Sequence, residues 1–230
     1  MSKNTASLEK RLYSKETEVA SPTRRKFLGY AGATSGIFLF AAACKKNDDS
    51  GIDLGSGDTG ILNYAYALEQ METAFYEMVL ASPNNGLSAA EIIFFKDIRD
   101  HEKAHREFLK NVLAGSAIPA LEVDFSSINF SSRDSIVNTA KTFEDTGVSA
   151  YNGAGRLLES AANLALAGKI VSVEARQAAY LRDIISNGSF ADNTVVDAMG
   201  LDMARTPKEV LSLVAPYIKT KINASNLPTS

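Results

Sequence analysis

The sequence is poor in the side chains that build disulfides and imidazole-rich metal sites. It holds one cysteine, Cys44, and two histidines among 230 residues. A single cysteine excludes an intrachain disulfide, and two histidines mean that any metal site must take most of its ligands from carboxylates. Residues 1–43 hold seven of the 24 basic and three of the 27 acidic residues, which leaves the remainder near −7. Such a balance offers no basic face for nucleic-acid binding.

The first 43 residues are typical of an export signal. A basic segment with the pair Arg24 and Arg25 precedes an apolar run, residues 30–43, which ends in three alanines before Cys44. The run is too short to span a bilayer, which takes about 20 residues. Paired arginines followed by Phe-Leu resemble a twin-arginine translocation signal. Small residues that end in cysteine resemble a bacterial lipobox.

From this signal we expect an exported lipoprotein of the bacterial periplasm or cell surface, anchored to the membrane by lipid on Cys44. Residues 44–60 would be the lipidated cysteine and a flexible linker, because they are rich in Gly, Ser and Asp. The alternative is an ordinary secretory signal with a chance arginine pair and an incidental cysteine. Twin-arginine export carries folded proteins, often with a cofactor, and so favours a bound metal.

Four long helical patterns and one short one follow. Ser88 with Glu91 predicts a capping box at the start of the second, and Thr206-Pro207-Lys208-Glu209 predicts the start of the fifth, which would run to about Thr220. Few segments alternate like strands, so the fold class is all-α. The long helices are expected at residues 61–80, 89–113, 134–154 and 160–186, with a bundle over 61–186 and a C-terminal extension over 187–230.

The connection between the second and third helices decides the topology. The stretch 114–133 can extend to at most ~66–72 Å, whereas a helix of about 25 residues is ~38 Å long. The connection is therefore long enough to cross the whole bundle. A simple up-and-down bundle would need only a short loop here.

Each long helical pattern carries an apolar seam at alternating steps of three and four residues. Each seam has a glutamate at its middle. The seams are Leu62, Ala65, Glu69, Glu72, Tyr76, Val79; Phe95, Ile98, Glu102, His105, Leu109, Val112; Val137, Ala140, Glu144, Gly147, Tyr151, Ala154; and Ala167, Ile170, Glu174, Gln177, Leu181, Ile184.

The two halves of the bundle repeat each other. The matching pairs are Glu69/Glu144 and Tyr76/Tyr151, 75 residues apart, and Glu102/Glu174 and His105/Gln177, 72 residues apart. We therefore expect two copies of one helical hairpin about a pseudo-twofold axis, with four glutamates at one level of the core. Buried ionised carboxylates each lose several kcal/mol of solvation, so they must be protonated, paired with cations or bound to metal.

A glutamate on each of two helices, with Glu-x-x-His on each of the other two, is the dinuclear carboxylate motif of ferritin-like bundles. Over most of residues 61–186 the chain resembles the bacterial ferritin-like domain family. The resemblance implies a ferritin-like four-helix bundle with a long crossover, and an iron centre that could be dinuclear, could hold manganese or zinc instead, or could be empty. The implied metal ligands are Glu69, Glu102, His105, Glu144 and Glu174.

Gln177 departs from the family pattern, because it stands where the second histidine is expected. Its amide oxygen is a weak, neutral ligand, so the second metal position is in doubt. Glu72, one turn from Glu69, is either an extra ligand or a neighbouring acid. Tyr76 and Tyr151 would hydrogen-bond to the ligands or be ordinary core tyrosines.

Other interpretations of these residues stay open. The glutamates could be paired with Arg99, Lys103 or Arg176, or be protonated in a metal-free site. The sequence His101-Glu102-Lys103-Ala104-His105 also matches the His-Glu-x-x-His signature of zinc metalloproteases. That interpretation needs a third ligand, for which Glu122 and Glu144 are candidates, and a substrate-binding strand, of which there is no sign.

Three functional classes follow from the sequence. The first is a metal-dependent oxidoreductase that acts on a small oxidant, dioxygen or peroxide. The second is a metal-binding or storage module, and the third is a metal-free scaffold with a structural or interaction role at the cell envelope. The glutamine at position 177 favours the second and third classes over the first. Apolar residues off the seams, such as Phe75 and Phe94, could pack inside the chain or at the face of a homodimer.

Overall fold

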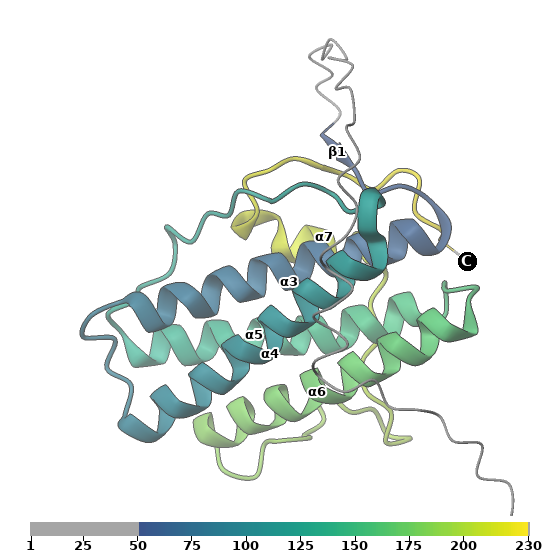
Figure 1. Cartoon of the computed structure of the whole chain (residues 1–230). Coiled ribbons are helices and arrows are strands. Elements are labelled where there is room, and N and C mark those ends of the chain that lie inside the picture. The colour runs from purple at the N-terminus through teal and green to yellow at the C-terminus, as the bar shows by residue number, and fades with distance from the viewer. Residues whose placement is uncertain (1–50, 230) are drawn as a thin grey trace, which may run out of the picture. The chain divides into compact units, whose positions relative to one another are not determined.

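The computed structural model describes residues 51–229, in which four long helices form one bundle (Figure 1). The helix α3 packs against α4, and α5 packs against α6, so the bundle consists of two helical hairpins. The all-α class and the four-helix bundle predicted from the sequence are confirmed. The helices are α3 (Gly57–Ala81), α4 (Ala89–Leu113), α5 (Arg133–Gly155), α6 (Ala161–Ile185) and the short α7 (Pro207–Val214).

Both predicted capping boxes are present. The Ser88 hydroxyl accepts a hydrogen bond from the backbone N–H of Glu91, whose carboxylate accepts one from the N–H of Ser88. Thr206 and Glu209 form the same arrangement at the start of α7. The expected end of this helix near residue 220 is wrong. The chain passes at Val214 into a 3₁₀ turn, Ala215–Tyr217, that contains Pro216, and a proline cannot continue an α-helix.

The connection from α4 to α5 crosses the length of the bundle, as predicted (Figure 1). After a 3₁₀ turn, Ala114–Ser116, its backbone is held by two buried side-chain amides of α3. The Asn63 amide donates to the carbonyl of Ser116 at 2.9 Å and accepts from the N–H of Ile118 at 3.0 Å. The Gln70 amide oxygen accepts from the N–H of Leu121 at 2.9 Å. These amides satisfy backbone groups that have no secondary-structure partner.

Residues 51–60 are not the flexible linker that the sequence suggested over 44–60. The strand β1 (Ile52–Asp53) pairs in parallel with β2 (Ile222–Asn223), and Leu54 is fully buried. The carbonyl of Leu54 accepts a hydrogen bond from Asn63 at 3.0 Å. The helix α3 already begins at Gly57, four residues before the start expected from the apolar pattern. Arg24, Arg25 and Cys44, on which the export and lipid-anchor expectations rest, lie outside the described residues.

The C-terminal extension packs on the bundle and belongs to the same compact unit. The helix α7 lies against α5 and buries Val210 and Val214. Arg205, just before α7, donates its backbone N–H to the carbonyl of Ser149 at 2.9 Å. Gly153 permits this close approach, since a Cβ there would lie 1.8 Å from the Arg205 carbonyl oxygen. The extension therefore covers the outer side of α5.

Aromatic side chains fill part of the bundle core. Phe75 is fully buried and meets Phe143 edge to face at 5.0 Å between ring centroids, so it packs inside the chain.

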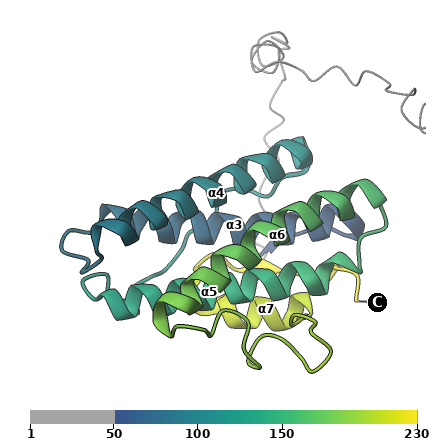
Figure 2. The same cartoon turned by 90° about the horizontal axis from the view of Figure 1, so that it is seen from below.

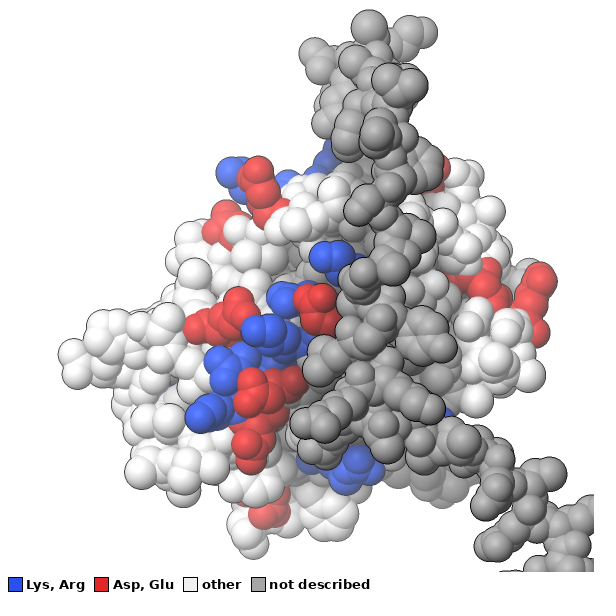
Figure 3. Space-filling model, viewed as in Figure 1, with Lys and Arg blue, Asp and Glu red and all other residues white. Residues whose placement is uncertain are grey.

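On the face drawn in Figure 3, acidic and basic side chains lie interspersed over α4, where Arg106 pairs with Glu107 at 2.8 Å. Among residues 51–229, no helix has the length and apolar character needed to cross a membrane.

Candidate metal centre

Four glutamates, one from each long helix, meet in the middle of the bundle. Glu69, Glu102, Glu144 and Glu174 are all 0% exposed, and Glu72 of α3 is buried beside them. Their seam positions turn them inward, because each lies within an apolar stripe that faces the other three helices. The structure thus brings together the carboxylates that the sequence pattern singled out.

His105 lies against three of these carboxylates. Its Nδ1 is 3.2 Å from Glu174 Oε1, 3.3 Å from Glu102 Oε2 and 3.5 Å from Glu69 Oε2. One potential ligand atom from each of these four residues lies within 4.8 Å of the other three. One imidazole and three carboxylates from α3, α4 and α6 therefore form a compact group of metal-ligating type. We call this the His105 half of the centre.

Gln177 and Glu144 are two further proposed ligands that lie outside this group of four. The side-chain amide of Gln177 donates a hydrogen bond to Glu102 Oε1, the carboxylate whose other oxygen faces His105. Glu144 does not belong to the group of four around His105 and contacts Tyr76 instead. The two halves differ because an amide stands in place of an imidazole. We call Glu144 and Gln177 the Gln177 half.

Two tyrosines hold two of the carboxylates. The hydroxyl of Tyr151 donates to Glu69 Oε1, and the hydroxyl of Tyr76 donates to Glu144 Oε1 at 2.5 Å. Tyr151 of α5 contacts a glutamate of α3, and Tyr76 of α3 contacts a glutamate of α5. Each of these bonds fixes one carboxylate oxygen, and the other oxygen of the same group, Oε2, forms no hydrogen bond. The tyrosines are thus bonded to two of the carboxylates that the sequence proposed as ligands.

Glu72 fits beside Gly147 of α5. A Cβ at Gly147 would lie 2.8 Å from Glu174 Oε2 and 3.3 Å from Glu72 Oε1. The missing side chain therefore makes the space in which Glu72 and Glu174 lie. Gly147 follows Glu72 by 75 residues, so it is also the repeat counterpart of Glu72. The extra carboxylate of one hairpin occupies a space left by the glycine of the other.

Burial and mutual repulsion raise the pKa of most of these carboxyls. Desolvation, opposed by hydrogen bonding to His105, raises the pKa of Glu69 from 4.5 to about 7. Desolvation and the negative charges of the neighbouring glutamates raise the pKa values of Glu72, Glu144 and Glu174 well above the ordinary range. Without a cation, part of the cluster must therefore carry protons at neutral pH.

Glu102 and His105 form the charged pair within the cluster. Desolvation alone would raise the pKa of Glu102, but hydrogen bonds and the positive charge from His105 lower it below the usual value. Burial likewise opposes the charged form of His105, but Glu102, Glu174 and Glu69 raise its pKa far above 6.5. One imidazolium thus compensates one carboxylate. The single positive charge of His105 does not balance the charges of the other buried carboxylates.

Several buried oxygens of the cluster form no well-aligned hydrogen bond, although two of them, Glu69 Oε2 and Glu174 Oε1, lie near His105 Nδ1. Buried polar atoms without a hydrogen bond are rare in folded proteins, and each one needs an explanation, such as a bound ion. Carboxylate oxygens, one imidazole nitrogen and one amide oxygen are a donor set that accepts a metal ion. The residues present therefore fit a bound metal. The atoms without a well-aligned hydrogen bond are Glu69 Oε2, Glu144 Oε2, Glu174 Oε1, Glu174 Oε2 and Gln177 Oε1.

The basic residues proposed as alternative partners of the glutamates either contact other side chains or are exposed to solvent. Arg99 pairs with Asp100 at 2.7 Å, and Arg176 donates to Ser172 at 2.9 Å, both on the bundle surface. Lys103 is exposed. Ion pairing of the glutamates with these three residues is therefore not seen.

The metalloprotease interpretation finds no matching geometry. His101 is exposed on α4, outside the group formed by His105 and three glutamates. Glu122, one proposed third ligand, is exposed and pairs with Lys219 at 3.2 Å. A zinc ion bound at His105 would therefore lack His101, the second histidine ligand that the motif needs.

Sequence reasoning missed Tyr64. It lies on α3 two residues after Leu62 and one before Ala65, off the seam, and yet only 1% of its surface is exposed. Its hydroxyl is buried without a hydrogen-bond partner. The only sequence signal was an aromatic residue with a polar end in a mostly apolar stretch of α3. That signal does not reveal what the hydroxyl faces.

Comparison with known families agrees with this geometry. The family described as the ferritin-like domain matches residues 57–187, which span α3 to α6 and more than half of the chain. No curated protein matches the chain. The match covers all four helices that supply the buried carboxylates and His105. The chain therefore belongs to the ferritin-like domain family.

Proposed function

We propose that the protein binds iron at the centre of its bundle and acts in iron binding or in redox chemistry with dioxygen or peroxide. The observation that carries this proposal is the His105 half. There an imidazole nitrogen lies within 3.5 Å of three buried carboxylates, two of which have oxygens without a well-aligned hydrogen bond. Iron accepts both carboxylate and imidazole ligands. Manganese and zinc are the competing metals for the same donors.

The proposed centre is asymmetric. One metal position would be held by His105 with Glu69, Glu102 and Glu174. A second position would be held by Glu144 and Gln177, together with Glu102, which contacts Gln177. The second position should bind more weakly, because a neutral amide oxygen is a poorer ligand than an imidazole. The contact between the Gln177 amide N–H and Glu102 supports this order, since it uses an oxygen that the second metal would need.

Bound iron would supply one-electron chemistry between its ferrous and ferric states. The chain's own part would be to balance charge, orient the ligands and exclude water. Tyr151 and Tyr76 each hold one oxygen of Glu69 and Glu144, so these carboxylates are oriented before a metal arrives. Glu72, buried one turn from Glu69, would be an additional carboxylate that takes up or releases a proton as the charge of the centre changes.

A metal-free scaffold is the second candidate function. One observation favours it. The His105 imidazolium and the Gln177 amide already contact Glu102, Glu174 and Glu69. In that case the carboxylates with raised pKa values would stay protonated, and the bundle would serve a structural or interaction role at the cell envelope.

We also propose that the protein works outside the cytoplasm as a lipoprotein of the periplasm or cell surface. The support is the sequence pattern alone: paired Arg24 and Arg25, a short apolar run and Cys44. Lipid on Cys44 would attach the protein to a membrane. A homodimer is a further proposal, for which the exposed apolar side chains of Ile92 and Ile93 at the start of α4 offer a surface.

Metal analysis of the full chain, purified in detergent without chelator and reconstituted anaerobically with ferrous iron, tests the proposed function. We expect about one tightly bound iron per chain and a second that dialysis removes. Glu102→Ala should lose both, because Glu102 contacts both halves. Glu107→Ala, on the exposed side of the same helix, is the matched control and should retain the metal.

Parallel samples with manganese and zinc decide which ion binds best. Iron that is released by dialysis as easily from wild type as from Glu102→Ala would overturn the proposal. A folded wild type that takes up no metal at all would leave the scaffold function.

A further inference from the structure

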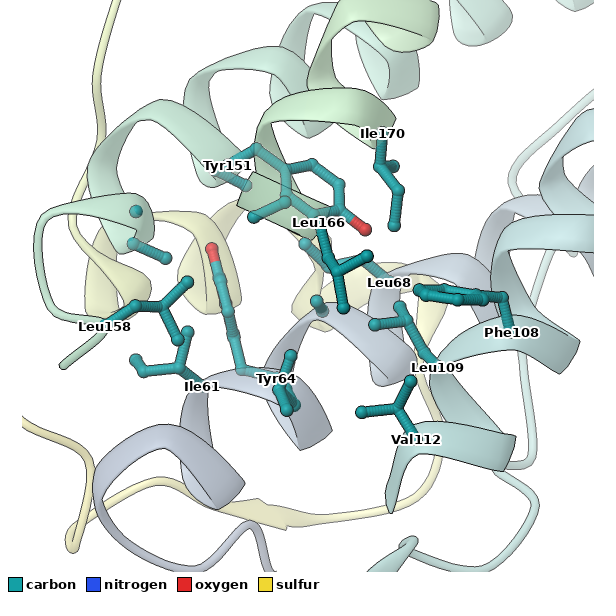
Figure 4. Close-up of a pocket in the computed structure, with 16 residues that line it drawn as sticks. Ile61, Tyr64, Leu68, Phe108, Leu109, Val112, Tyr151, Leu158, Leu166 and Ile170 are labelled. Carbon is teal, nitrogen blue, oxygen red and sulfur yellow. The ribbon is translucent and has the colours of Figure 1, made fainter. Parts of the chain in front are cut away.

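The C-terminal extension forms an open groove with the end of α5. Figure 2 shows α7 on the α5 side of the bundle, away from α4. The groove has a cavity volume of ≈ 680 Å³ and is lined by α7, by the two residues after α5 and by residues within 224–229. The apolar hollow among the four long helices, drawn in Figure 4, has a volume of only ≈ 20 Å³, room for about one water. The groove, by contrast, has the size of small-molecule sites, about 300–1,000 Å³.

The floor of the groove is aliphatic. Leu157, Pro207 and Leu227 line it and are buried, and Leu211 of α7 lines it and is half-buried. None of the described residues that line the groove is aromatic. The floor therefore offers apolar contacts to a hydrocarbon body, which gains affinity for every methylene group that leaves water.

Contacts that are distant along the chain hold the floor in place. The backbone N–H of Leu227 donates to the carbonyl of Ala224 at 3.2 Å, and the Asn226 side-chain amide donates to Asp53 at 2.9 Å. Leu227 packs directly on α3, since a Cβ at Gly60 would lie 2.8 Å from its Cδ2. The groove is thus formed before a ligand arrives, which lowers the entropy that binding costs.

Two cations form a basic rim on this groove. Arg156 and Lys208 both line it and are exposed. Within residues 51–229, neither side chain forms an ion pair or a hydrogen bond. None of the described residues that line the groove is acidic, and Glu209, the next residue after Lys208, accepts a hydrogen bond from Thr206 instead. The groove therefore carries a local positive charge on a chain whose net charge is −3.

We propose that this groove binds a small amphipathic anion, with an aliphatic body on the leucine floor and an oxyanion head, carboxylate or phosphate, at the basic rim. An apolar surface with a few charged groups that fix orientation is the usual composition of a small-molecule site. The guanidinium of Arg156 suits either head, because its fork of N–H groups matches both geometries. The inference goes beyond the proposed function and does not rest on it, since no ligand of the proposed metal centre lines the groove.

Short-chain probes separate the head from the body. The full chain, reconstituted in uncharged phosphatidylcholine vesicles, is titrated by calorimetry, and the heat from protein-free vesicles is subtracted. Hexanoate and hexyl phosphate test the two heads, and at least one should bind saturably. Hexanol and hexylammonium keep the body without the anion and should bind about tenfold more weakly or less. Butanoate, shorter by two methylene groups, should bind about tenfold more weakly than hexanoate.

Charge variants test the rim. Arg156→Gln and Lys208→Gln should each weaken the bound anion by about threefold, the value of one exposed ion pair, and together by about tenfold. Lys169→Gln removes the same charge from an exposed position of α6 and should bind like wild type. Equal anion affinity in the double variant and in Lys169→Gln would overturn the proposal, as would tighter binding of hexylammonium than of either anion.

A bulky side chain tests the location. Ala215 lines the groove and is exposed, so Ala215→Trp should weaken the bound anion by at least about fivefold without burying new volume in the core. Ala104→Trp places the same ring on the exposed side of α4 and should bind like wild type. No saturable binding of either anion by wild type would also overturn the proposal. Iron uptake and its loss in Glu102→Ala are measured separately, so the failure of one proposal is distinguishable from the failure of the other.

Discussion

Tyr151 of α5 donates its hydroxyl hydrogen bond to Glu69 of α3, and this contact has a mirror within the chain. Moving each partner to its repeat position 75 residues away turns the pair into Glu144 and Tyr76, which form the same bond in the opposite direction. The pair Gln177–Glu102 corresponds in the same way to His105–Glu174. The pseudo-twofold relation expected from the sequence thus extends to individual contacts, and asymmetry enters through two substitutions, Gln for His and Gly for Glu.

Removing the hydroxyl of Tyr151 should destabilise the bundle. In Tyr151→Phe, Glu69 Oε1 would stay buried without its donor, which costs about 1–3 kcal/mol in the free energy of unfolding. Urea denaturation of the metal-free protein at pH 7.5 measures this. Tyr180→Phe, at an exposed position of α6, is the control and should change stability by less than about 0.5 kcal/mol. Equal stability of the two variants would mean that the bond to Glu69 contributes nothing.

Restoring a histidine at position 177 should restore the second metal position. The pseudo-twofold relation places residue 177 against Glu102 as His105 lies against Glu174. Gln177→His should therefore raise the iron content from about one to about two tightly bound ions per chain. Metal analysis after dialysis is the measurement. His105→Gln, the converse change, should leave two amide halves and no tight site; if it retains iron as wild type does, the His105 half is not the primary position.

Adding a methyl group at Gly147 should disturb the centre without removing any ligand. The new Cβ would lie 2.8 Å from Glu174 Oε2, so Glu174 must move. We expect Gly147→Ala to weaken iron binding by about 10–100-fold, the range seen when groups that position ligands are changed. Competition with a chelator of known affinity measures the change.

Gly168→Ala is the matched control for this prediction. A Cβ at Gly168 meets nothing within 4 Å, and the residue lies inside α6. This variant should gain about 0.5–1 kcal/mol of stability from helix propensity and bind iron like wild type. Iron affinity that is equally unchanged in Gly147→Ala would show that Glu174 does not need its present position.

Local patterns predicted what depends on local physics. Seam spacing alone placed Glu69, Glu102, Glu144 and Glu174 in the core, because helical periodicity fixes which side chains face inward. Capping residues fixed helix starts for the same reason, as at Ser88. The match of residues 57–187 to the ferritin-like domain agrees with the bundle inferred from these patterns.

What the sequence could not predict depends on contacts distant along the chain. The strand at residues 52–53 forms because Ile52 pairs with Ile222, which is distant along the chain. The local composition alone predicts a linker there. The direction of the Tyr151–Glu69 bond depends on how α3 and α5 cross.

Metal-free protein should lose stability as the pH rises from about 4.5 to 7. Burial raises the pKa of Glu69 from 4.5 to about 7, and burial and repulsion raise those of Glu72, Glu144 and Glu174 in the same direction. The folded state therefore keeps protons that the unfolded chain has already released, and stability falls wherever the folded state binds more protons. Stability is fully present below the unfolded value and is lost as pH rises through the folded one.

For Glu69 alone the shift corresponds to a loss on the order of 3 kcal/mol between pH 4.5 and 7.5. Urea denaturation at pH 5 and pH 7.5 checks the sign, and Glu69→Gln, which cannot titrate, should show a smaller difference between the two pH values.

Iron should reverse this dependence of stability on pH. A bound cation competes with protons for the same oxygens, so the stabilisation by metal should be larger at pH 7.5 than at pH 5. A metal-free protein that gains stability from pH 5 to pH 7.5 would contradict the raised pKa values, because the buried carboxylates would then be better compensated when ionised.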